Sequence, residues 1–145
     1  MSGLDATTRA FVELTIATDD QAVKLMDLGA TRAADPALRS FAAGLASARR
    51  SELTELRAIL DPVPYMNYHE GHDMPGMPTE AELVALAASQ DFDTEFTRLA
   101  RAHLTESSTV AQSGLKAIKH KRTHTMASAM EQERTSALRT LDTLA

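Results

Sequence analysis

Residues 11 to 41 read FVELTIATDDQAVKLMDLGATRAADPALRSF, and this stretch decides the fold. Its first part repeats apolar or small side chains every three or four residues, the pattern of an amphipathic helix in a bundle: Phe11, Leu14, Thr18, Ala22, Leu25 and Leu28. Asp35 can then cap a helix N-terminus, and Pro36 suits the first helical position. Because the connection is short, the sequence predicts an antiparallel helical hairpin over about residues 5–60.

Helix signals resume after residue 78. The segment from Thr79 to Glu82 has the pattern of a capping box and predicts a short helix over 79–90. Asp91 or Asp93 can cap the following helix, and a break near residues 119–123 separates it from a last helix. A second hairpin is therefore expected over about residues 91–145.

The two hairpins match each other. Shifting the chain by 85 residues pairs Phe11 with Phe96 and Gly29 with Gly114, which indicates a tandem duplication. Two such hairpins would bury their apolar faces against each other. The sequence thus predicts an all-α four-helix bundle of two tandem hairpins, with a short helix and a long crossover loop over 61–78, in a single domain over residues 1–145.

The composition excludes several classes of function. The net charge is -5 and there is no cysteine, so a nucleic-acid surface, a disulfide framework and a thiolate metal site are not expected. No run is long and apolar enough for a membrane span, and the N-terminus lacks the pattern of a signal peptide. We therefore expect a cytoplasmic protein, or a secreted one if a signal has been removed. Familiar enzyme motifs are missing from the sequence, so enzymatic activity is not expected.

The crossover loop has the most unusual composition in the chain. Residues 61–78 read DPVPYMNYHEGHDMPGMP and hold four of the five prolines. His69 and His72 place two imidazoles close together, and Met74 and Met77 add thioethers, a ligand mixture that suits copper better than zinc. The alternative is that methionine and tyrosine side chains simply fix an irregular loop to the bundle.

The segment HDMPGMPTEAELVALAASQDFDTEF, residues 72–96, resembles a signature of the domain of unknown function 305 family, and the resemblance extends over nearly the whole chain. It implies a ferritin-like helical bundle, often secreted, with copper binding in some members. The family pattern places a histidine pair in each repeat. These pairs fall on Thr18 and Asp19 in the first repeat and on His103 and Leu104 in the second, so His103 is the one matching residue.

Three further histidines carry weaker predictions. His103 lies on the inward stripe of its helix, where a neutral core residue bonded to Glu52 or Asp19 is the alternative to a metal ligand. His120 and His124 are four residues apart, but neighbouring lysines and a predicted helix break favour a solvated basic turn.

The sequence as a whole predicts a transition-metal protein, with copper as the preferred ion. The proposed ligands are His69, His72, Met74, Met77 and His103. The alternative is a non-catalytic bundle that has lost its metal site and acts by self-association, partner binding or small-ligand binding. Stripes of small residues are compatible with a homodimer, and neither a nucleic acid nor a membrane is expected as a partner.

Overall fold

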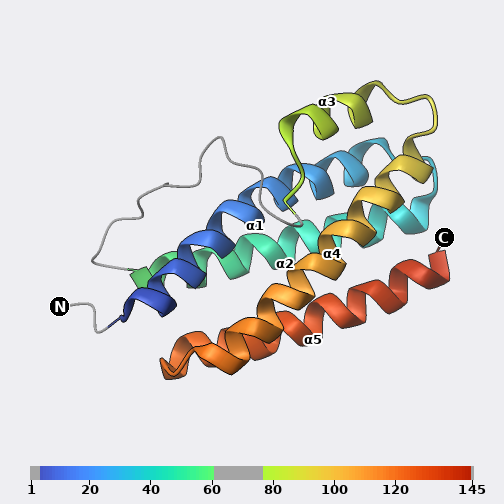
Figure 1. The fold of residues 1–145 in the computed structure, drawn as a ribbon. Helices are drawn as coiled ribbons and strands as arrows, with labels where there is room; N and C mark the ends of the chain where they lie inside the picture. Colours follow the sequence, from blue (N-terminus) through green and yellow to red (C-terminus); the bar gives the residue numbers. More distant parts are fainter. Residues whose placement is uncertain (1–3, 61–76, 145) are drawn as a thin grey trace.

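The computed structural model describes residues 4–60 and 77–144, which form five α-helices and, over these ranges, no strand. The helices are α1 (Ala6–Arg32), α2 (Pro36–Leu60), α3 (Glu80–Ala88), α4 (Phe92–Ala117) and α5 (Lys121–Leu144). Figure 1 shows the four long helices side by side, with α3 lying over one end of the bundle. The prediction of an all-α bundle is confirmed.

Local sequence signals fix most of the helix ends. The Asp5 side chain accepts a hydrogen bond from Thr8 N at the start of α1, and Asp35 accepts one from Ala37 N at the start of α2. Thr79 and Glu82 form the predicted capping box of α3, each side chain bonding the other's backbone amide at 3.0 Å. The helix break near residues 119–123 begins slightly earlier than predicted, because α4 ends at Ala117 and α5 starts at Lys121.

The prediction for the start of α4 is wrong in its mechanism. Asp91 occupies the N-cap position but makes no capping hydrogen bond with its side chain. Asp93 instead reaches the turn between α1 and α2, where its carboxylate accepts hydrogen bonds from Ala34 N at 2.8 Å and Asp35 N at 3.0 Å. This carboxylate therefore joins the two hairpins.

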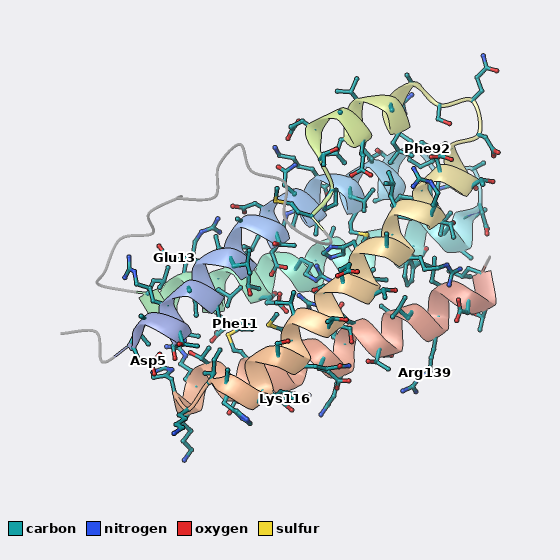
Figure 2. The ribbon with its side chains drawn as sticks, viewed as in Figure 1. Asp5, Phe11, Glu13, Phe92, Lys116 and Arg139 are labelled. Atoms are coloured by element: carbon teal, nitrogen blue, oxygen red, sulfur yellow. The ribbon has the colours of Figure 1, made fainter. Side chains whose placement is uncertain are left out.

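The internal duplication appears in the packing of α1 against α4. The Phe96 ring lies against Gly29, so that a Cβ atom built on this glycine would come within 2.5 Å of the ring. Phe11 lies against Gly114 in the same way, with the corresponding distance 2.8 Å, and Figure 2 shows Phe11 between α1 and the end of α4 that carries Lys116. Each repeat thus inserts its phenylalanine against the other repeat's glycine, and α1 and α4 run antiparallel.

The apolar core is divided along the bundle axis. One cluster, around Leu25, Ala42 and Phe96, fills the end that α3 covers. Two further clusters pack at the other end, one around Val12 and Leu56 and one around Phe11 and Met130. Between the two ends, charged side chains take inward positions.

Candidate functional site

The middle of the bundle holds three fully buried charged side chains. Asp19 on α1, Arg49 on α2 and Arg134 on α5 each have 0% of their surface exposed. His103 on α4 is 1% exposed, so all four long helices contribute to the cluster. Charged groups this deeply buried require partners, because transfer of an unpaired charge out of water is very unfavourable.

Arg134 is paired through all three of its nitrogens. Its Nη1 and Nη2 donate to the two carboxylate oxygens of Glu52 at 2.8 and 2.7 Å, a bidentate pair. Its Nε donates to Ser107 Oγ at 2.9 Å, and Nη2 also lies 3.3 Å from Asp19 Oδ1. Glu133 accepts a further bond from Nη1 at 2.5 Å.

Arg49 is paired through one nitrogen. Its Nη1 lies 2.6 Å from His103 Nε2 and 3.4 Å from Asp19 Oδ1. Its Nε lies 3.7 Å from Glu133 Oε2, too far for a hydrogen bond. Neither Nε nor Nη2 has a hydrogen-bond partner among the described residues. Arg49 therefore contributes to the cluster mainly through its positive charge. Arg134, in contrast, donates hydrogen bonds from all three of its guanidinium nitrogens.

Two of the carboxyl groups around these arginines, Asp19 and Glu52, have pKa values that are shifted in opposite directions. Burial raises the pKa of Asp19 well above its usual range, and the adjacent Glu52 raises it further. Burial also opposes ionisation of Glu52, but hydrogen bonds from Asp19 and Arg134 outweigh this effect and lower its pKa from 4.5 to about 2. Asp19 Oδ2 meets no donor among the described residues, and a proton on Asp19 lets this carboxyl donate to Glu52 instead.

The hydrogen bond from Arg49 fixes the state of His103. A guanidinium has donors and no acceptor, so Nε2 accepts the bond with its lone pair. The predicted burial of His103 is confirmed. Glu52 or Asp19 was the predicted partner, whereas the hydrogen bond comes from Arg49, whose Nη1 also lies 3.4 Å from Asp19 Oδ1. A metal ion at this imidazole would have to displace the hydrogen bond from Arg49 and would place its charge beside that guanidinium.

The structure brings two of the predicted metal ligands together. Met77, which is half-buried, and His103 line one pocket of about 120 Å³, together with Pro78, Glu82, Leu99 and Ala102. His69, His72 and Met74 lie outside the described residues. Within the described ranges no group of three or more acidic or histidine side chains could hold a metal ion.

The other two histidines serve local structure. His120 lies just before α5, and its Nδ1 accepts a hydrogen bond from Thr123 N at 3.3 Å. His124 is exposed, and its Nε2 lies 3.1 Å from Leu115 O. The break between α4 and α5 ends at His120, and His124 lies in the first turn of α5, where its backbone N donates to His120 O at 2.8 Å.

Neither buried arginine is among the residues predicted from the sequence. Arg49 and Arg134 are 85 residues apart and thus occupy equivalent positions in the two repeats. Each also falls on the inward stripe of its helix, four residues after an apolar core position, Leu45 and Met130 respectively. An arginine at the same inward position of both repeats is the sequence feature that could have predicted an ion network in the centre of the bundle.

Comparison with known families places the chain in a family. The family model described as "Domain of unknown function (DUF305)" matches residues 8–145. The protein therefore belongs to the DUF305 family, as the resemblance in its sequence indicated. No curated protein matches the chain.

Solved structures share the fold at low sequence identity. A DUF305 fragment from Deinococcus radiodurans superposes with a TM-score of 0.82 at 21% identity, covering 97% of this chain and 95% of that one. CopM in its Cu(I)-bound form gives 0.81 at 16% identity, with 94% of each chain covered. CopM in its Cu(II)-bound form gives 0.81 at 20% identity, again with 94% of each chain covered. At these identities the similarity establishes the fold alone. The bound copper is a property of the CopM structures.

One finding bears on the predicted location. No helix within the described ranges is long and apolar enough to cross a membrane. The cytoplasmic location itself stays a prediction, as do the expected partners and the homodimer.

Proposed function

We propose that this protein binds copper, with Cu(I) as the preferred ion, through the proline-, histidine- and methionine-rich segment over residues 61–78. The observation that carries the proposal is that Met77 and His103 line the same pocket. Membership of the DUF305 family and the two copper-bound structures of CopM support it.

The proposed ligands suit a soft cation. Imidazole and thioether groups favour Cu(I) and Cu(II) over hard ions such as Mg²⁺, and thioethers favour the reduced state. His69, His72 and Met74 stay predicted ligands, and Met77 is the member of the set whose surroundings the structure describes. His103 would contribute only with loss of its bond from Arg49, so we place it at the edge of the site.

An anaerobic titration with Cu(I) in competition with a chromophoric chelator tests the proposal. The informative variant is Met77→Leu, which keeps the apolar volume and removes the thioether. Its matched control is Met126→Leu, because Met126 is also half-buried but packs against the Val12 cluster. We expect weaker Cu(I) binding for Met77→Leu and for His69→Ala with His72→Ala, and unchanged binding for the control.

The same proteins can be melted with and without Cu(I). A ligand that binds only the folded state raises the melting temperature with the logarithm of its concentration. Wild-type protein that shows neither a shift nor stoichiometric Cu(I) would refute the proposal.

A second function is favoured by a different cavity. A pocket of about 110 Å³ opens between α1, α4 and α5, and its walls are mostly apolar, with Leu14, Val110 and Met130 among the lining side chains. An apolar cavity of this order can hold a small ring compound. A bundle that uses this pocket for a small apolar ligand would melt independently of copper, and its melting temperature would rise with a probe such as phenol.

A further inference from the structure

The buried arginines differ in how their charge is used, although the duplication makes them equivalent. Arg134 has hydrogen-bonding partners for Nε, Nη1 and Nη2. Arg49 directs one nitrogen at His103 Nε2 and Asp19 Oδ1 and leaves Nε and Nη2 without hydrogen bonds in the described structure. A guanidinium retained for its planar fork would use more of its donors.

The groups around Arg49 are those that bind a metal. A neutral imidazole nitrogen and a carboxyl oxygen that has given up its proton are ordinary ligands of Zn²⁺, Co²⁺ and Cu²⁺. His103 Nε2 and Asp19 Oδ1 both meet the same Arg49 nitrogen, and Glu133 Oε2 lies 3.7 Å from Nε on the more exposed side. Side chains with ligand atoms, from α1, α4 and α5, thus surround one cation that the chain supplies from α2, and with Arg49 in place the described side chains are not arranged to hold a metal ion.

We infer that the centre of the bundle is a cation site that the protein fills with its own Arg49 guanidinium, which keeps divalent transition metals out. The core in its present form does not fit a bound metal ion, because that ion would compete for the His103 lone pair and meet a fixed positive charge within hydrogen-bond distance. Copper bound by this protein therefore stays outside the core.

The inference predicts that removal of Arg49 opens a metal site. We would use Co²⁺ as the probe, because its visible absorption reports nitrogen and oxygen coordination, and we would work in a His69→Ala and His72→Ala background. In that background we expect Arg49→Ala to bind Co²⁺ and to melt at a higher temperature when Co²⁺ is present. Adding His103→Gln should weaken Co²⁺ binding by at least about 100-fold, the upper end of the effect of an outer-shell partner. Arg134→Ala, which removes the equivalent arginine, should not create the site.

The test gives an answer whether or not the Arg49→Ala variant folds without metal. If Arg49→Ala unfolds without metal, recovery of its helical circular dichroism on refolding with Co²⁺ supports the inference, and an unfolded chain in both conditions overturns it. A folded Arg49→Ala protein that binds Co²⁺ no more tightly than the background also overturns it. The background lacks the loop imidazoles, so this result is independent of whether the loop binds Cu(I).

Discussion

The contact between Gly29 and Phe96 gives the sharpest test of how the two repeats pack. A Cβ atom at Gly29 would lie 2.5 Å from two atoms of the Phe96 ring and 2.8 Å from Ala42 Cβ. Phe96 and Ala42 are both 0% exposed, so neither can move into free space. Gly29→Ala should therefore force the helices apart, a kind of overpacking that costs roughly 1–3 kcal/mol.

Gly44 provides the matched control. It lies in α2, which like α1 is a long helix, and a Cβ atom there would meet nothing within 4 Å. Gly44→Ala should stabilise the protein by about 0.5–1 kcal/mol, because alanine is the better helix former. Gly29→Ala has the same gain in helix propensity but also the clash with Phe96. The difference between the two variants therefore reports the clash alone, and we expect Gly29→Ala to be about 2 kcal/mol less stable than Gly44→Ala.

Urea unfolding followed by far-UV circular dichroism measures this difference. Thermal unfolding is a second measurement: for a chain of this size, each kcal/mol of unfolding free energy shifts the melting temperature by roughly 3–4 °C. Gly114→Ala should fall between the two variants, since its closest contact is 2.8 Å and Phe11 is 8% exposed and can shift. If Gly29→Ala stabilised the protein as much as Gly44→Ala, the reciprocal packing of the repeats would be refuted.

Further variants test the polar contacts. Glu52 has a pKa lowered from 4.5 to about 2, so its contribution to stability is complete above pH 4.5 and is lost as the pH falls toward 2. Acid titration of the unfolding free energy should show this loss, and Glu52→Gln should remove it. At neutral pH the same variant leaves Arg134 without its bidentate partner, which should cost about 3–5 kcal/mol in urea unfolding. Asp93→Ala should lose about 1–2 kcal/mol by thermal melting, because two backbone amides lose their acceptor. Asp91→Ala, whose side chain makes no capping bond, should change the melting temperature little, and an equal loss would contradict the assigned role of Asp93.

The candidate site could be predicted only in part. The inward position of His103 followed from the periodicity of its helix, and its burial is confirmed. The pocket that joins it to Met77 did not follow, because a loop residue 26 positions earlier has no fixed spacing to a helix face. For the loop histidines the metal assignment remains a prediction from residue type.

The sequence by itself determined the helices and their duplication. Apolar spacing, the Asp35–Pro36 signal and the Thr79–Glu82 capping box act within a few residues, so they can be read along the chain. Only the tertiary structure decided which side chain neutralises which in the centre. Arg49 meets residues 30 and 54 positions away, and Arg134 meets Asp19 across 115 positions. Such pairings depend on how the four helices are rotated about their axes. Helical periodicity predicts which face of a helix a residue lies on, but it does not predict which residue of another helix packs against that face.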